Sequence, residues 1–255
     1  MCSSDLPSPF SVSIESDEGG STLHAERIVN AAGPFANDVA VMLGAALPVH
    51  NVLQQKIAFE DVARAIPRDL PFTIDIDPGP IHWDDEERAS MRDEPALERY
   101  LGEMPGGIHC RPEGGESGRW IKLGWAYNTS RSSASREPAL DRHFPEIVLR
   151  GAARLHPALN AYDERFPRNM THYGGYYTMT EENWPLIGPL GVENAFVVGA
   201  MSGFGTMAAC AAGDLTARWV LGQELPDYAP ALSLQRYRDA ALMKTLSNAR
   251  SRGLL

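Results

Sequence analysis

The chain has 255 residues, enough for one large domain or two modest ones, and its 44% hydrophobic content is ordinary for a protein with a buried core. A formal net charge of −10 at pH 7 argues against a general nucleic-acid binder or membrane-surface binder. No apolar run approaches the roughly 18 residues that a membrane-spanning helix needs. The polar first residues show no signal-peptide pattern.

The three cysteines, Cys2, Cys110 and Cys210, form no CxxC pair, and the seven histidines show no zinc-binding spacing. We therefore expect free thiols, a reducing cytoplasmic compartment and no bound metal. We also expect Cys110 and Cys210 to be buried as small hydrophobic side chains.

A hairpin is predicted first. Strand-like segments at Phe10–Glu15 and Thr22–Ala31 flank the turn signal Asp17–Gly20. The second segment ends at a glycine, Gly33, after which a helix is expected.

Pro34 suits the first turn of that helix, and Gly44 suits its end. The spacing predicts an apolar helix face that consists of Phe35, Val39 and Met42. The result is a strand, a glycine and a helix in succession.

The middle of the chain, from Leu47 to about Tyr177, has a different texture, typical of an antiparallel sheet with few helices. Its acidic stretch Asp84–Glu98 is interpreted as a solvated face. One amphipathic helix is predicted at Pro145–His156, where Pro157 stops it. The predicted strands are Val52–Phe59, Phe72–Ile76, Trp120–Tyr127 and Asn169–Tyr177.

After Thr180 the chain returns to an α/β texture. The apolar run 195–200 predicts a strand buried on both faces of a parallel sheet. A glycine turn follows it, and then a helix at Ala208–Leu221 that ends at Gly222. The free N–H groups and positive dipole end at the start of this helix suit an anionic group held close to the backbone. The expected buried face of the helix is Ala208, Ala212, Leu215 and Trp219.

This turn also fits a dinucleotide fingerprint, Gly203-x-Gly205-x-x-Ala208, with Glu224 roughly twenty residues on. No second strand–helix unit follows, however, and Pro226 places Glu224 in an apparent loop. The pattern alone leaves three interpretations open: a turn required by packing, a nucleotide phosphate site, or a site for another electron-rich group.

Three segments in order resemble one family. Ala25–Ala36 is similar to its VVNAAGPWA signature, Tyr177–Pro189 to TPDxxPLIGP, and Glu193–Gly205 to NLFVATGHSGHG. The chain thus resembles the D-amino-acid oxidase/sarcosine oxidase superfamily of FAD-dependent oxidoreductases, from about Phe10 to Tyr237.

The resemblance and the texture together predict an α/β (α+β) fold, with the remnant of an FAD-binding Rossmann-like domain interrupted by a mostly antiparallel-sheet substrate domain. The expected segments are 1–46 and 178–255 for the FAD domain and 47–177 for the substrate domain. The GxGxxG unit that opens family members is missing, so we expect a C-terminal portion of a flavoenzyme. By itself this portion is expected to bind FAD weakly or not at all and to be inactive.

The resemblance implies that FAD is bound noncovalently, because Gly175 falls near the position of the cysteine that tethers flavin in sarcosine oxidases. Positive charge at the helix start would favour the electron-rich form of the ring. The implied cofactor contacts are Ala32, Gly33, Pro34, Ser202, Gly203, Phe204, Gly205, Thr206 and Met207.

Lys122 lies in a strand, Trp120–Trp125, that resembles the LKLGY strand of monomeric sarcosine oxidase. The resemblance implies that its cation helps O2 accept electrons; the alternative is an exposed lysine on an edge strand. Tyr177 is the second catalytic candidate, and sheet packing is its alternative role.

Four substrate contacts are also expected, and for Arg111 the reason is that a guanidinium suits a carboxylate. Its alternative role is that of a turn residue. The expected substrate residues are Gln55, Arg111, His172 and Tyr176.

The predicted function is therefore FAD-dependent oxidation of an amine or amino acid, with hydride leaving a C–N carbon and the imine hydrolysing afterwards. Neither O2 nor another electron acceptor is singled out. One alternative is an NAD-linked dehydrogenase that uses the Gly203/Gly205 turn, and another is a non-catalytic oxidase-like subunit. The expected partner is the small-molecule substrate, without nucleic acid or a membrane span; an oligomer or a partner subunit is left open.

Overall fold

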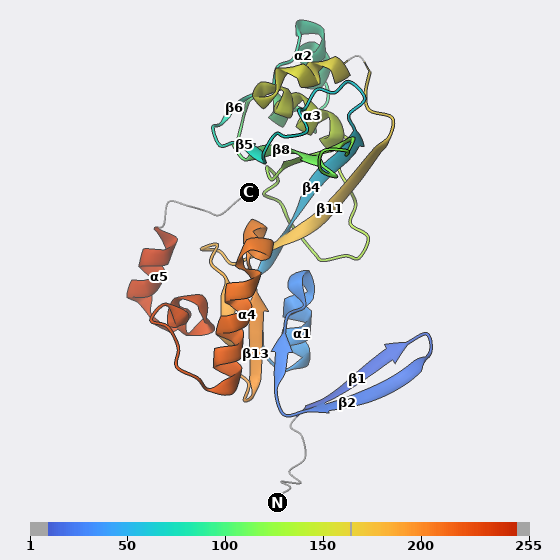
Figure 1. Cartoon of the computed structure of the whole chain (residues 1–255). Coiled ribbons are helices and arrows are strands. Elements are labelled where there is room, and N and C mark those ends of the chain that lie inside the picture. The colour runs from blue at the N-terminus through green and yellow to red at the C-terminus, as the bar shows by residue number, and fades with distance from the viewer. Residues whose placement is uncertain (1–9, 164, 249–255) are drawn as a thin grey trace, which may run out of the picture. The chain divides into compact units, whose positions relative to one another are not determined.

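The computed structural model describes residues 10–163 and 165–248 of the chain, which divides into two compact units (Figure 1). The first unit combines the described residues up to Asn51 with those from Tyr177 onward, and the second is Val52–Tyr176. The chain thus leaves the first unit within strand β4 (His50–Glu60) and returns within strand β11 (Met170–Met179).

The first unit opens with the predicted hairpin. Strands β1 (Phe10–Ser16) and β2 (Gly19–Ala25) pair antiparallel, and Ser16 lies opposite Gly19 at the turn. Gly19 has φ of 126°, a backbone conformation that residues other than glycine rarely adopt. The predicted second arm is not one strand but two, because the chain turns after β2 and starts β3 (Ile28–Asn30) in another sheet.

That other sheet has the order β12–β13–β3. Strand β13 (Ala195–Gly199) is parallel to β3 and antiparallel to β12 (Leu186–Pro189). The expectation of a purely parallel environment is therefore wrong on one side, since the short link between β12 and β13 allows only antiparallel pairing. Burial alternates along β13 as well: Ala195 and Val197 are buried, and Phe196 is half-buried.

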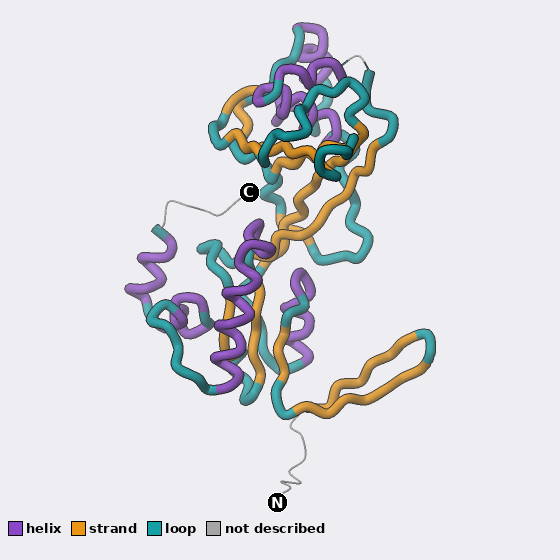
Figure 2. The backbone as a smooth tube through the Cα atoms, viewed as in Figure 1, coloured by secondary structure: helices purple, strands orange, loops and turns teal. Residues whose placement is uncertain are grey.

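Each of the parallel strands leads through a 3₁₀ turn into a helix. Strand β3 continues into η1 (Gly33–Phe35) and α1 (Ala36–Met42), and β13 into η4 (Ser202–Phe204) and α4 (Gly205–Leu221). Helix α4 contacts β13, and α1 contacts β3 (Figure 2). Both predicted helices are confirmed, and the residue after α4 is left-handed as expected, with φ of 64°.

The predicted faces of the two helices fare differently. On α4, Ala212 and Leu215 are buried as expected. On α1 the expected apolar face is wrong, because Met42 is 82% exposed and the buried residues are Ala36 and Ala40. The small side chains of Ala36 and Ala40 let this short helix pack closely against the sheet, while Val41 and Met42 are exposed.

The first unit ends with η5 (Ala229–Leu232), η6 (Leu234–Arg238) and α5 (Ala240–Ser247), held by a buried ion pair. Arg236 is fully buried, and its Nε donates to Glu182 Oε1 over 2.7 Å. Tyr237 Oη donates to the same carboxylate oxygen over 2.8 Å. The remaining guanidinium protons reach the carbonyl oxygens of Pro185, Ala231 and Trp184.

The second unit is built on a six-stranded sheet with the order β10–β4–β9–β8–β5, on which β11 also pairs with β4. The pairs β4/β9, β9/β8 and β8/β5 are antiparallel, as predicted for this part of the chain. The remaining bounds are β5 Thr73–Asp75, β8 Ile108–Glu113, β9 Trp120–Trp125 and β10 Arg131–Ser132, with a separate pair β6 Gly79–Pro80 and β7 Glu103–Met104.

Helix α3 (Phe144–Leu155) confirms the predicted amphipathic helix and packs against β8 and β9. Its Gly151 allows this approach, since a Cβ there would lie 2.4 Å from Cζ3 of Trp125. The main core of the unit forms around it. It includes Ile57, Phe59, Ile108, Ile121, Leu123, Trp125, Phe144, Val148 and Ala152.

The acidic stretch is more than a solvated face, because part of it is helix α2 (Asp85–Arg92). Asp84 accepts a hydrogen bond from the Glu87 amide, and Glu87 accepts one from the Asp84 amide. This capping box was readable from the Asp-x-x-Glu spacing. Met91 anchors the helix in the core. Short 3₁₀ segments complete the unit at Glu98–Leu101 (η2) and Pro157–Tyr162 (η3).

No helix among the described residues is long and apolar enough to cross a membrane.

We predict that Arg236→Met destabilises the first unit by about 3–5 kcal/mol, because the Glu182 carboxylate, only 2% exposed, then remains buried without its cation. Chemical denaturation followed by circular dichroism measures the free energy of unfolding.

Arg218→Met is the matched control. It breaks an i,i+4 pair with Asp214 in which the side chains are 41% and 65% exposed, and we expect nearly unchanged stability. Equal losses in the two variants would contradict the structural role assigned to Arg236.

Candidate functional site

Two strand–turn–helix junctions lie next to each other in the first unit. In the parallel pair, Ala195 lies opposite Ile28 and Val197 opposite Asn30. The carboxyl ends of adjacent parallel strands meet at one edge of a sheet, which is where α/β proteins bind their ligands. The turn at Gly33 and the turn at Ser202 therefore open on the same edge.

The turn at Ser202 has an unusual backbone. Ala200 and Ser202 both have positive φ, 55° and 51°, although neither is glycine. Non-glycine residues in this region cost on the order of 1 kcal/mol or more and concentrate at functional sites. Among the described residues, Ser202 Oγ is one of the few buried side-chain atoms without a hydrogen-bond partner.

Helix α4 begins directly behind this turn without a side-chain cap. Its N-cap is Phe204, whose side chain has no hydrogen-bond acceptor, so no side chain caps the first amides. Those amides belong to Gly205, Thr206 and Met207, and the positive end of the helix dipole adds to them. The arrangement suits an electron-rich group brought close to the backbone.

Gly203 brings a predicted catalytic residue to this turn. A Cβ at Gly203 would lie 3.0 Å from the Cε2, Cζ and Oη atoms of Tyr177. The phenol ring thus packs directly on the glycine backbone. Burial raises the pKa of Tyr177, so its hydroxyl keeps its proton at neutral pH and can donate a hydrogen bond.

The second junction is braced by a buried asparagine that the sequence-based predictions missed. Asn30 Nδ2 donates to the Ala36 carbonyl over 2.7 Å, and its Oδ1 accepts from the Ala32 amide over 3.2 Å. Gly33, next in the turn, has φ of 56°, and a Cβ there would meet open space. The signal in the sequence is a polar residue, 2% exposed, at the end of an apolar strand.

A hydrogen-bonded chain runs from this junction to β11. Asn51 Nδ2 donates to the Pro34 carbonyl over 2.8 Å, and Thr178 Oγ1 donates to Asn51 Oδ1 over 2.8 Å. Because Thr178 is the neighbour of Tyr177 in the chain, the turn at Pro34 and the strand that carries the tyrosine are held together. Sequence analysis had not singled out Asn51 or Thr178.

In the second unit, Lys122 lies on one open face of the large sheet. Strand β9 lies between β4 and β8, so the alternative of a lysine on an edge strand is wrong. Lys122 is opposite Arg111 in the register, and both contact Glu113 Oε1: Lys122 Nζ at 3.0 Å and Arg111 Nε at 2.8 Å. Arg111, expected to clamp a substrate carboxylate, already holds one from its own chain.

A buried histidine shares this face. A Cβ at Gly124 would lie 2.4 Å from His109 Nε2, so the imidazole lies over the glycine backbone. His109 Nδ1 lies 3.1 Å from the Gly107 carbonyl, and the ring centroid is 5.2 Å from that of Phe72. Burial lowers the pKa of His109 to about 4, with smaller contributions from Lys56 and the other cations of the face.

Gln55 and His172 lie on the opposite face of the same sheet. Gln55 Oε1 accepts from the Asp141 amide over 2.8 Å and lies 3.0 Å from His172 Nε2. The His172 ring stacks on Phe144 of α3 at 5.6 Å. Burial lowers the pKa of His172, opposed by Asp141. Because strand side chains alternate, these two residues are separated by the sheet from Lys122 and Arg111.

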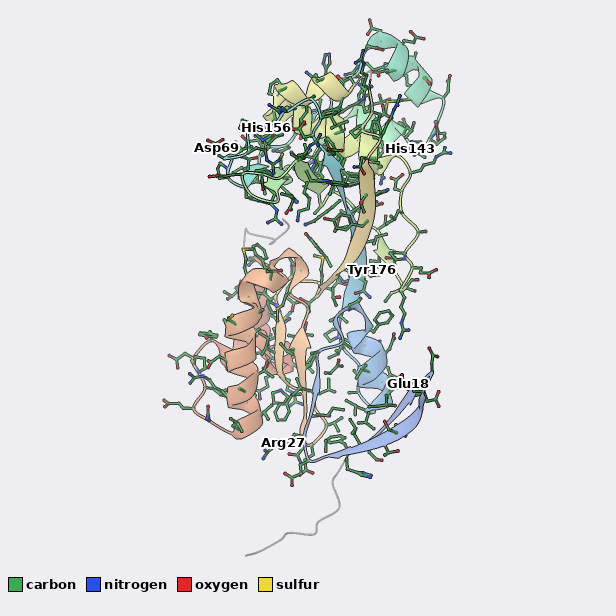
Figure 3. All side chains as sticks on the ribbon, turned by 45° about the vertical axis from the view of Figure 1, so that its right-hand side comes forward. Glu18, Arg27, Asp69, His143, His156 and Tyr176 are labelled. Atoms are coloured by element: carbon green, nitrogen blue, oxygen red, sulfur yellow. The ribbon has the colours of Figure 1, made fainter. Side chains whose placement is uncertain are left out.

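Figure 3 labels Tyr176 on β11. By alternation along this strand it shares the face of His172, four residues earlier. Its hydroxyl accepts a hydrogen bond from the Ser135 amide over 3.1 Å. Of the four expected substrate residues, the structure thus brings Gln55 and His172 into contact and places Arg111 on the other face.

The two cysteines behave differently from each other. Cys110 is buried as expected, and burial, with Asp61 adding to it, raises its pKa to about 12. The expectation for Cys210 is wrong, because it is exposed. Two residues before the buried Ala212, its position on α4 points away from the sheet.

Comparison with known proteins decides the family. Residues 9–219 match the family model DAO, described as FAD dependent oxidoreductase. This chain belongs to the DAO family of FAD-dependent oxidoreductases. No curated protein matches the chain.

Solved structures have the same fold. Glycine oxidase from Geobacillus kaustophilus matches with a TM-score of 0.58 and 19% identity, over 88% of this chain and 48% of that one. L-proline dehydrogenase from P. horikoshii matches with 0.60 and 17%, over 89% and 50%. NikD, an amino acid oxidase essential for nikkomycin biosynthesis, matches with 0.59 and 18%, over 89% and 52%. The chain spans about half the length of each.

We predict that His109 makes stability fall as the pH drops. Between pH 6.5 and about 4 the imidazole takes up a proton in the unfolded chain but stays neutral in the folded one. The free energy of unfolding therefore falls by about 3 kcal/mol over this window and does not fall further below it. In His109→Phe that loss disappears, as measured by urea denaturation across the window.

The control is His24→Phe on the exposed face of the hairpin, which should keep the wild-type slope. An unchanged slope in His109→Phe would show that the buried imidazole is not the titrating group.

Proposed function

We propose that this protein takes part in the FAD-dependent oxidation of an amine or amino acid, in which a hydride leaves the carbon that bears nitrogen and the imine is then hydrolysed. Family membership supports the FAD-dependent class. The observation that carries the proposal is the pair of strand–turn–helix junctions on adjacent parallel strands.

The residues of these junctions fit the cofactor. Ser202 Oγ is buried without a partner, α4 starts without a side-chain acceptor, and Gly33 leaves open space beside its backbone. When bound, FAD supplies the acceptor for the hydride. We propose noncovalent contacts from Ala32, Gly33, Pro34, Ser202, Gly203, Phe204, Gly205, Thr206 and Met207.

Three further residues receive roles in this proposal. The Lys122 ammonium stabilises negative charge as it develops on dioxygen, for which a fixed cation is well suited. The Tyr177 hydroxyl, protonated and packed on Gly203, donates a hydrogen bond at the turn that contains Ser202 and Gly203. Arg111 orients a substrate carboxylate while Glu113 keeps its guanidinium in place.

Gln55, His172 and Tyr176 are assigned positioning roles. Gln55 accepts from the Asp141 amide and contacts His172, which ties β4 and β11 to the segment before α3. Tyr176 in the same way holds the segment at Ser135. A direct substrate contact of these three side chains remains a prediction.

The NAD-linked alternative lacks support in the geometry. Directly after α4 the described residues form η5, η6 and α5 rather than a strand, so Glu224 does not lie at the end of one. The Glu224 carbonyl accepts from Arg218 Nη1 over 3.2 Å, which places this residue in the loop behind α4. A ribose-binding carboxylate belongs at the end of a strand.

The test separates the two half-reactions of the protein loaded with FAD. In Lys122→Met we expect flavin reoxidation by O2 to slow on the order of 10²-fold, because the cation beside the developing charge is gone. Anaerobic reduction of the flavin, measured at a saturating concentration of the amino acid, should stay nearly unchanged. Stopped-flow absorbance measures both rates.

Lys244→Met, which removes an exposed lysine of α5, should change neither rate. Equal slowing of both half-reactions in Lys122→Met would remove the oxygen role. A protein loaded with FAD whose flavin no amine or amino acid reduces would contradict the proposed function itself.

A further inference from the structure

Lysine is rare in this chain, and its placement is uneven. Of the 23 basic side chains only three are lysines, Lys56, Lys122 and Lys244. Two of them, Lys56 and Lys122, lie on the same open face of the six-stranded sheet. The register shows this directly: Lys56 is opposite Gly124, and Lys122, two residues earlier on β9, is opposite Ala58.

The open face carries more positive than negative charge. Lys56, Lys122 and Arg111 contribute three positive charges, and Glu113 contributes one negative charge. Glu60, also on this face, is neutralised by Arg119 at 2.8 Å. The net charge of the cluster is +2, although the chain as a whole carries −10.

Glu113 does not serve all three cations. Its Oε1 atom contacts both Lys122 Nζ and Arg111 Nε. In the part of the chain that the structure describes, no hydrogen bond or ion pair involves the ammonium of Lys56. A half-buried cation without a carboxylate is costly, and an anion from outside would relieve it.

The surroundings of Lys56 agree with this need. Burial lowers the pKa of Lys56, and the charges of Lys122 and Arg111 lower it further. The groups that face it are Lys122 from β9, Arg111, His109 and Glu113 from β8, and Tyr173 from β11.

The floor beside Lys56 is shaped by a glycine. At Gly124 a Cβ would lie 3.2 Å from Lys56 Cγ and 2.4 Å from His109 Nε2. Any side chain there would displace both residues, so the glycine lets the stem of Lys56 and the His109 imidazole pack over the same part of β9. His109 is uncharged at neutral pH and adds no further repulsion.

We propose that Lys56, together with Lys122 and Arg111, binds a ligand with two anionic groups, and that the substrate of the reaction is accordingly an amine that bears two carboxylates. The assignment of this amine as the substrate rests on the proposed function. One carboxylate would neutralise Lys56. The other would contact Lys122 and Arg111, which share the single carboxylate of Glu113.

The test needs neither FAD nor turnover. With lysine labelled at ¹³Cε, the intact chain gives three signals, which single substitutions assign. Malonate, a simple dicarboxylate, is titrated in; we expect saturable shifts of the Lys56 and Lys122 signals, and a rise in the pKa of Lys56. The Lys244 signal should stay still, and the neutral diamide malonamide should shift none of the three.

Variants assign the effect to charge. Lys56→Met should weaken malonate binding about tenfold or more, as expected for the loss of one charge-assisted contact. Lys56→Arg should retain most of the binding, which separates charge from fold, and Lys244→Met should bind like the wild type. The remaining lysine signals report whether each variant folds.

Malonate that leaves the Lys56 signal in place, or that moves the Lys244 signal equally, would overturn the site. Acetate that binds as tightly as malonate would overturn the two-carboxylate requirement. Either result can occur while the flavin half-reactions proceed normally, in which case the proposed function stands without this site. Malonate binding without any flavin chemistry would support this site and contradict the proposed function.

Discussion

The parallel pairing of β3 with β13 is the contact on which the first unit depends. It joins Val29 to Phe196, two residues that the whole second unit separates in sequence. Once these strands are side by side, the turns at Gly33 and Ser202 must open on one edge of the sheet. Their strained backbone, the unpaired Ser202 Oγ and the uncapped α4 then concentrate at the same place.

The second unit works by a different principle, the division of one sheet into two chemically distinct faces. The face toward α3 holds the apolar core together with the uncharged pair Gln55 and His172. The open face holds charge in excess of its own counter-ions. Strand alternation alone produces this division, so a shift of register by one residue would exchange the faces.

Local patterns predicted the elements better than the site. The glycine turns, the hairpin, α4 with Gly222, α3 and the main strands all follow from short-range signals. The face of α1 and the exposure of Cys210 depend on tertiary packing, and the prediction of both was wrong. The open face joins positions 56, 109 and 122, which only strand pairing brings together, so no local pattern could group them.

The central claim, that the amides at the start of α4 hold a flavin, is tested most directly by amide NMR of the chain during titration with FAD. The method detects weak binding, and NAD⁺ serves as the competing ligand. The account predicts saturable shifts at Gly203, Gly205 and Thr206 with FAD, larger under anaerobic reduction because negative charge then faces the helix dipole. Unmoved amides with FAD, or larger shifts with NAD⁺, would contradict it.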